Sequence, residues 1–219
     1  MPFTTQAELY TAIADWLDRD DLTTRIPDFV TLNEVTMNRI FNTAEMEVQS
    51  TALTTSSSVP TVTLPTGFMQ IRRLRVLIGS TYRDVQIVPL EPSLDSGMTP
   101  GGYPVVASVV GSSLYFKPQP NGAYPLLLNY YAKFAVLTSS TTNWILDEHP
   151  DAYLYGSLLQ SAPFLGTDER LPLWKEAFEA AVQQINDEDT AKRFGSMKLR
   201  ADVALTTPPQ FNVYTGWGR

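Results

Sequence analysis

The chain has 219 residues, of which 43% are hydrophobic and 18% charged, enough apolar material for one large folded domain or two small ones. It has no cysteine, which excludes disulfides, thiolate nucleophiles and cysteine-based metal sites. The formal net charge of −7 and the pI of about 4.7 argue against sequence-specific DNA binding, which usually needs a basic surface.

The first 58 residues predict a helical hairpin. Thr5 and Glu8 have the spacing of a capping box, and a hydrophobic helix face follows: Leu9, Ile13, Trp16 and Leu17. Pro27 suits the first turn of a second helix. Its apolar stripe predicts that this helix runs to about Gln49: Met37, Ile40, Phe41, Ala44 and Val48. Residues 50–58 are rich in Ser and Thr and predict a connector.

Residues 59–137 predict a β-rich domain, because they hold nine of the 16 prolines and alternate short apolar runs with turns. The expected strands are 62–64, 71–78, 82–88, 105–110, 114–117 and 126–134. The expected turns are Gly79-Ser80, Gly111-Ser112 and Asn121-Gly122, and Asn-Gly favours the positive φ of a tight hairpin. For residues 91–102 we expect one helical turn and a loop.

Residues 138–194 predict two more helices. Pro150 begins the first, Pro163 and Gly166 end it, and its buried side is expected to hold Tyr153, Leu154, Leu158 and Ala162. Residues 167–189 form the second, with an apolar face of Leu171, Trp174, Phe178, Ala181 and Ile185. Pro172 leaves the first residue of this helix open.

The expected fold class is therefore α+β, with four segments. Residues 1–58 and 138–194 supply N- and C-terminal helices that pack as one helical bundle. Residues 59–137 form an inserted antiparallel β-rich domain, and residues 195–219 form an extended C-terminal arm.

The end of the chain combines basic and aromatic side chains. Residues 138–190 carry a net charge of −8, whereas residues 191–219 carry +4. Aromatic residues and arginine are common interface anchors, and disordered tails usually lack aromatics. We therefore interpret this end as an arm that orders on a partner, with these contact residues: Lys192, Arg193, Lys198, Arg200, Phe211, Tyr214, Trp217 and Arg219.

The sequence shows no pattern that predicts catalysis, a metal site or a cofactor. His149, the lone histidine, precedes Pro150 at a helix start, where a capping or surface role is expected. No Gly-x-Ser-x-Gly elbow and no phosphate-binding loop accompany it. Three aspartates, Asp18, Asp20 and Asp21, lack the EF-hand pattern and are interpreted as a solvated turn.

Three arginines fall in the expected strand 71–78. Arg73 and Arg75 should share one face because side chains alternate along a strand, and Arg72 should point the other way. They are interpreted as a solvent face with salt bridges or as a subunit contact, and a weak surface facing DNA is the alternative. Trp16 and Trp174 are expected in the core, while Trp144 is expected in a loop as a possible interface residue.

The order of several short motifs resembles the head-to-tail adaptor proteins of tailed bacteriophages, also called connectors, gatekeepers or tail tubular A-like proteins. The motifs cover the chain to about residue 195 and include Ile26-Pro27-Asp28-Phe29 with Glu34, Asn38 and Arg39, Leu64-Pro65-Thr66-Gly67-Phe68, residues 111–120, Asn143-Trp144-Ile145-Leu146, residues 150–156 and Trp174. Each motif is weak by itself, and their order and spacing carry the resemblance.

The resemblance implies a structural virion protein at the head–tail junction, assembled in the bacterial cytoplasm. Such adaptors form a dodecameric ring below the portal, extend the DNA channel without sequence-specific binding and give the tail or nozzle a place to attach. Helical parts typically contact the portal, and C-terminal segments often dock into it, so residues 192–219 would grip an acidic portal surface. No enzymatic activity, cofactor or membrane contact is implied.

Three other interpretations remain open at this point. The chain could be another tail component, such as a tail terminator or fibre joint. It could be a hydrolase that uses His149, or a carbohydrate-binding β module that uses Trp144.

Overall fold

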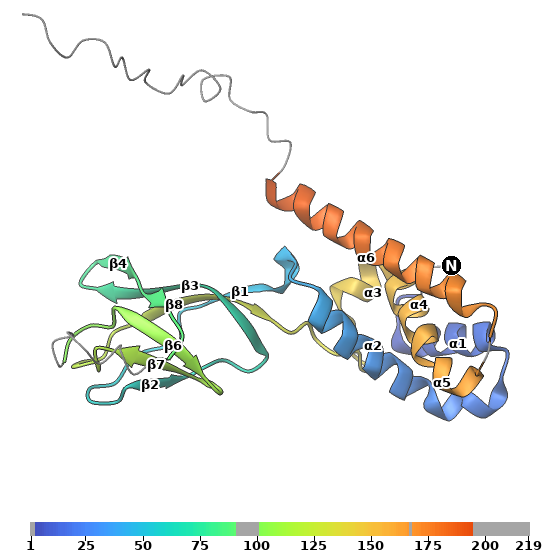
Figure 1. The fold of residues 1–219 in the computed structure, drawn as a ribbon, viewed down its shortest axis with the longest axis horizontal. Helices are drawn as coiled ribbons and strands as arrows, with labels where there is room; N and C mark the ends of the chain where they lie inside the picture. Colours follow the sequence, from blue (N-terminus) through green and yellow to red (C-terminus); the bar gives the residue numbers. More distant parts are fainter. Residues whose placement is uncertain (1–2, 91–100, 167, 195–219) are drawn as a thin grey trace, which may run out of the picture.

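The computed structural model describes residues 3–90, 101–166 and 168–194, and Figure 1 shows a helical part and a β part joined end to end. The expected α+β class is confirmed. Helices from both ends of the chain form the helical part, and strands from the middle form the β part. None of the helices in these ranges is both long and apolar enough to cross a membrane.

The helical part is built around one central helix. Its elements are α1 (Gln6–Leu17), η1 (Asp20–Arg25), α2 (Ile26–Ile40), α3 (Trp144–Glu148), α4 (Pro150–Gln160), α5 (Ala162–Leu165) and α6 (Leu171–Phe194). α4 packs against α1, α2 and α6. The shared core includes Ile13, Met37, Tyr153 and Trp174, each almost fully buried.

The β part consists of two four-stranded sheets that pack over one apolar core. The first sheet has the order β1 (Glu47–Ser50), β8 (Leu126–Ala132), β3 (Phe68–Ile78) and β4 (Thr81–Asp84). The second has the order β2 (Thr61–Thr63), β7 (Ser113–Lys117), β6 (Val106–Val110) and β5 (Gln86–Ile87). Neighbouring strands are antiparallel except β5 and β6. Leu74 of the first sheet and Phe116 of the second both lie in this core.

Local sequence signals position several element ends. The capping box is confirmed, since the Thr5 hydroxyl accepts from the Glu8 N–H and Glu8 Oε2 accepts from the Thr5 N–H at 3.2 Å. Gly79 and Gly111 take the positive φ of the expected turns. Pro172 is the second residue of α6, where a missing N–H costs no helical hydrogen bond.

The second helix is shorter than its apolar stripe predicts. α2 ends at Ile40, and Phe41 is extended and buried. A short 3-10 turn, η2 (Ala44–Met46), leads into β1, where Val48 pairs with Tyr130. The prediction of a helix to Gln49 was wrong because pairing with β8 satisfies this backbone instead. β1 thus lies within the segment 1–58 that was expected to be helical.

Two predictions about tryptophans and one about a turn were also wrong. Trp16 is 43% exposed rather than buried, although its ring contacts that of Tyr155 edge to face, with centroids 5.6 Å apart. Trp144 begins α3 instead of lying in a loop, and Asn143 caps that helix. Neither Asn121 nor Gly122 has a positive φ, because this segment crosses from one sheet to the other and forms no hairpin. The expectation for 91–102 falls outside the described residues except at its last two positions.

Candidate interaction surfaces at the junction of the two parts

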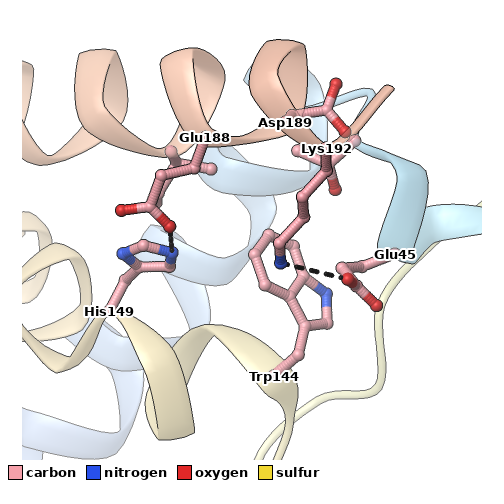
Figure 2. Close-up of a pocket in the computed structure, with 8 residues that line it drawn as sticks. Glu45, Trp144, His149, Glu188, Asp189 and Lys192 are labelled. Carbon is pink, nitrogen blue, oxygen red and sulfur yellow. Dashed lines mark hydrogen bonds and ion pairs between the residues drawn. The ribbon is translucent and has the colours of Figure 1, made fainter. Parts of the chain in front are cut away.

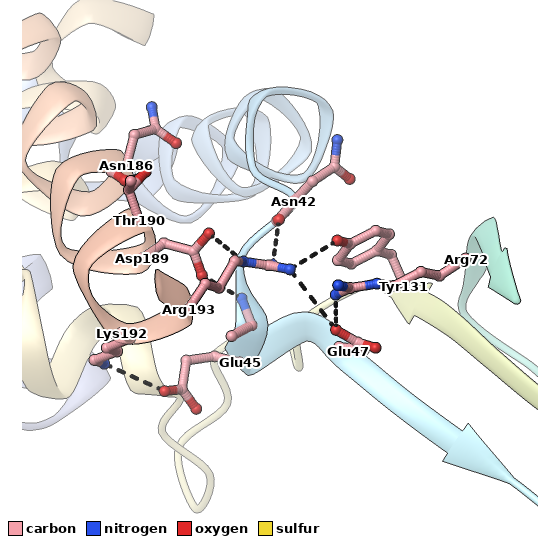
Figure 3. A network of polar contacts seen from close by, with 11 residues as sticks. Asn42, Glu45, Glu47, Arg72, Tyr131, Asn186, Asp189, Thr190, Lys192 and Arg193 are labelled. Atoms are coloured by element: carbon pink, nitrogen blue, oxygen red, sulfur yellow. Dashed lines mark hydrogen bonds and ion pairs between the residues drawn. The ribbon is translucent and has the colours of Figure 1, made fainter. Parts of the chain in front are cut away.

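The last turn of α6 lies where the helical part meets the β part (Figure 3). Arg193 donates three hydrogen bonds there: from Nε to Asp189 Oδ2 at 2.7 Å, from Nη1 to the Tyr131 hydroxyl at 3.2 Å and from Nη2 to the Asn42 carbonyl at 2.9 Å. Its guanidinium also lies over the Tyr131 ring, 5.7 Å from the centroid. One side chain therefore joins α6 to β8 and to the segment after α2.

Lys192 and Asp189 add further links between α6 and its surroundings. Lys192 Nζ lies 3.2 Å from Glu45 Oε1 and 3.3 Å from Glu148 Oε2. These hydrogen bonds raise the pKa of the Lys192 ammonium. Asp189 also accepts a hydrogen bond from the backbone N–H of Ala44. Charged groups therefore hold the end of α6 against both α3 and η2.

A small cavity lies beside this contact, between α6 and α3 (Figure 2). His149 faces α6, with Nε2 3.5 Å from Glu188 Oε2, and it meets the Trp144 ring edge-on at 6.3 Å. The cavity volume of about 10 Å³ holds one water at most. Two buried polar atoms without a protein partner, Thr43 Oγ1 and Trp144 Nε1, belong to residues that line it. The cavity is too small for an organic substrate.

His149 therefore does not have the environment expected from the sequence. The residue is 6% exposed and its side chain forms no capping hydrogen bond, although its backbone is the N-cap of α4. The short break between α3 and α4 turns the imidazole beneath α6, where it packs. Within the described residues, no group of His, Asp and Glu side chains is arranged to hold a metal ion.

A buried polar network connects α2 with α3 and α4. Glu34 Oε1 accepts from the Leu137 N–H at 2.8 Å and from the Tyr153 hydroxyl at 3.2 Å. Asn143 donates to the same hydroxyl at 2.6 Å. Burial raises the pKa of the Glu34 carboxyl and that of the Tyr153 hydroxyl. Residues from three separate motifs of the sequence thus meet in one site.

The sequence of residues 4–200 matches the family model described as SU10 adaptor protein. The matched range contains both sheets, all the described helices, the junction and the buried polar network. The chain belongs to this adaptor family. A comparison with curated proteins found no match.

Family membership gives the adaptor a structural role in a phage virion, where it assembles with portal and tail proteins. The resemblance recognised in the sequence is thereby confirmed. Much of what carried that resemblance lies inside the fold: Glu34, Asn143 and Tyr153 bond to one another in the core. These residues support the adaptor's internal architecture.

The adaptor's three arginines on β3 are engaged within the chain. Arg72 forms an ion pair with Glu47 of β1, and Arg73 forms a bidentate one with Asp84 of β4, at 2.7 and 3.0 Å. Arg75 lies over the Tyr82 ring at 5.2 Å. Arg73 and Arg75 flank buried Leu74 and so share a face, as predicted.

The adaptor's proposed arm begins with two residues that the structure describes. Lys192 and Arg193 belong to α6, and both form ion pairs inside the chain. The other arm residues lie outside the described residues: Lys198, Arg200, Phe211, Tyr214, Trp217 and Arg219. Trp144 is half-buried, and its ring lies 6.4 Å from that of Phe41.

The sequence did not predict the contacts that Arg193 makes at the junction. Asp189 and Arg193 are four residues apart on one helix, a spacing that indicates an ion pair. Nothing local links them to Tyr131 or Asn42, which are far away in the chain. The sequence signal for these contacts is a pair of cations after a long acidic segment, and that pattern by itself predicts only the start of a basic arm.

Proposed function

We propose that this adaptor forms a ring below the portal, that the ring extends the DNA channel, and that the tail or nozzle attaches to it. The match over residues 4–200 carries this proposal. Twelve copies are what the resemblance implies. The chain's net charge of −7 suits a channel through which DNA passes without binding, since an acidic surface gains nothing from counterion release.

The junction supports the proposal in a second way. A ring subunit contacts a neighbour on each side, so its helical part and its β part must keep a fixed orientation relative to each other. Arg193 and Lys192 hold α6 against β8, α3, η2 and the segment between α2 and η2 through four hydrogen bonds. Because these bonds occupy Lys192 and Arg193, we place the portal-docking arm after Phe194.

Electron microscopy of the purified adaptor, alone and mixed with its portal, tests the proposal. We expect ring-shaped particles, at least in the mixture, with the adaptor stacked on one end of the portal. Rings seen only with the portal would show that the portal templates assembly. An adaptor that stays monomeric with the portal and copurifies with a tail protein instead would contradict the proposal and favour a tail component.

A further inference from the structure

A groove on the outer side of α2 has the features of a protein docking site. It has a volume of about 470 Å³ and lies between α2, Met69 of β3 and the segment after β8. Val35 and Val136 form apolar walls and are 42% and 58% exposed. Exposed apolar side chains that cluster in a groove are typical of an interaction surface.

The outer face of α2 continues this surface. Leu32, Val35 and Arg39 follow at spacings of three and four and are all exposed, whereas Asn33 and Met37 form the buried face. A surface helix normally presents a polar outer face to solvent. This helix instead places two aliphatic side chains, Leu32 and Val35, among the exposed polar residues Asp28, Thr31 and Arg39.

The charge of the groove indicates what it binds. Arg39 and Lys133 line it, and neither forms an ion pair within the described part of the chain. Glu34, the acidic residue of the lining, is 4% exposed, and its carboxylate accepts hydrogen bonds from Leu137 and Tyr153 in the core. The groove therefore has two available cations beside an apolar surface, which fits an acidic partner segment with an apolar anchor.

The first turns of α6 combine an exposed apolar side chain with an exposed acidic one, as such a partner segment should. Leu173 is 62% exposed, and Glu176 follows it by three residues, exposed and without an ion pair in the described residues. The nearby pair of Lys175 and Glu179 leaves Glu176 as the available charge. These turns belong to the most acidic stretch of the chain, residues 138–190, with a net charge of −8.

The two surfaces lie on opposite sides of the helical part. α4 packs against both α2 and α6 and separates them, as Figure 1 shows. Complementary surfaces on opposite sides of one subunit produce a head-to-tail contact, which closes into a ring when the rotation between subunits permits. A second copy of this chain therefore offers the partner that both charge and position favour.

We propose that the groove of one adaptor binds the beginning of α6 of the next adaptor. Leu173 of one copy fills the space among Val35, Met69 and Val136 of its neighbour, and Glu176 pairs with Arg39 and Lys133. This inference rests on the proposed ring and names one of the contacts between its subunits.

Charge reversal in the full-length adaptor tests the contact, with assembly measured by sedimentation and electron microscopy, alone and with portal. The double variant Arg39→Glu with Lys133→Glu should weaken self-association at least about tenfold, since like charges then face each other. Glu176→Lys should do the same. The triple variant has two glutamates in the groove and a lysine on α6, so opposite charges again face each other. Its self-association should return toward the wild-type level.

Arg25→Glu is the matched control, because Arg25 is an exposed arginine before α2 that pairs with Asp28 and lies outside the groove. It should assemble normally, and circular dichroism should show every variant folded. Assembly of the double variant at the wild-type level would overturn the proposed contact but not the proposed ring. Loss of portal binding with unchanged self-association would also overturn it and assign the groove to the portal. A wild-type adaptor that never forms rings would overturn both.

Discussion

Gly156 of α4 lies against the side chain of Asn33 of α2, and no side chain larger than hydrogen fits between them. A Cβ atom at Gly156 would come within 2.6 Å of Asn33 Cγ and Nδ2, closer than real Cβ atoms come. Asn33 is fully buried and donates from Nδ2 to the carbonyls of Ala152 and Tyr153, each at 3.2 Å. The pair sets the close approach of the two helices.

Gly156→Ala should therefore destabilise the adaptor. Alanine favours a helix by about 1 kcal/mol over glycine, but moving a buried, hydrogen-bonded asparagine costs about 1–3 kcal/mol or more. We expect a net loss and a lower midpoint of urea unfolding. Gly102→Ala is the control, since its added Cβ would lie at an ordinary 3.5 Å from Pro118. In an Asn33→Ala background, the same change at Gly156 should become neutral or stabilising.

Replacing Glu34 should alter how stability depends on pH. Burial raises the pKa of this carboxyl in the folded state above 4.5. The folded protein then binds the proton more tightly than the unfolded chain does, so this group's contribution to stability decreases as the pH rises through the raised pKa. The difference in unfolding free energy between wild type and Glu34→Gln should therefore change as the pH rises above 4.5 and through the raised pKa, in favour of the variant at the higher pH.

Glu34→Ala serves as the contrasting variant. It removes the acceptor of the Leu137 N–H and the Tyr153 hydroxyl and should cost about 1–3 kcal/mol at any pH, because a buried donor is left unpaired. Identical pH profiles for wild type and Glu34→Gln would contradict the role given to this carboxyl.

Arg193→Ala should loosen the junction. The change removes three hydrogen bonds from a side chain that is only 17% exposed, so we expect a loss of about 1–3 kcal/mol. Amide hydrogen exchange should rise in η2 and β1 before it rises in α4. Arg193→Lys should recover only part of the effect, because an ammonium lacks the planar fork that reaches several partners. Lys175→Ala breaks an exposed pair with Glu179 and should leave exchange unchanged.

Ending the chain after Phe194 tests the docking arm. The helical part and the β part contain every described core residue, so the truncated adaptor should fold with an unchanged unfolding midpoint. Portal binding should fall at least about tenfold, because aromatic and arginine anchors usually dominate an interface. Replacing only Phe211, Tyr214 and Trp217 by serine would separate the aromatic from the basic contribution. Normal assembly of the truncated adaptor on portal would refute the arm.

Much of the fold could be predicted because local signals agree with the tertiary structure. Thr5 and Glu8 cap α1, Pro150 begins α4, and the apolar residues Trp174, Phe178 and Ile185 of α6 are buried as their spacing indicates. The expected strands overlap the observed ones, because alternation and turn glycines operate over a few residues.

The predictions failed where a distant partner overrides a local preference. Residues 41–49 continue the apolar stripe of α2, yet Glu47–Ser50 form a strand because their backbone pairs with β8. Trp16 has the right spacing for the core, but it remains 43% exposed, because burial depends on how the other helices pack against α1. The sequence predicts a surface or capping position for His149, whereas the turn between α3 and α4 places its Nε2 3.5 Å from Glu188 Oε2 of α6.

The sequence by itself determined the family, the α+β class and the contrast between an acidic body and a basic end, since order, periodicity and charge are written along the chain. Only the tertiary structure decided that Arg193 bonds to Tyr131 and Asn42, that Glu34 faces the core while Arg39 faces a groove, and that Gly156 needs to be glycine. The physical reason is the same in each case: contacts between residues far apart in sequence depend on how helices and sheets pack, and no local pattern encodes that.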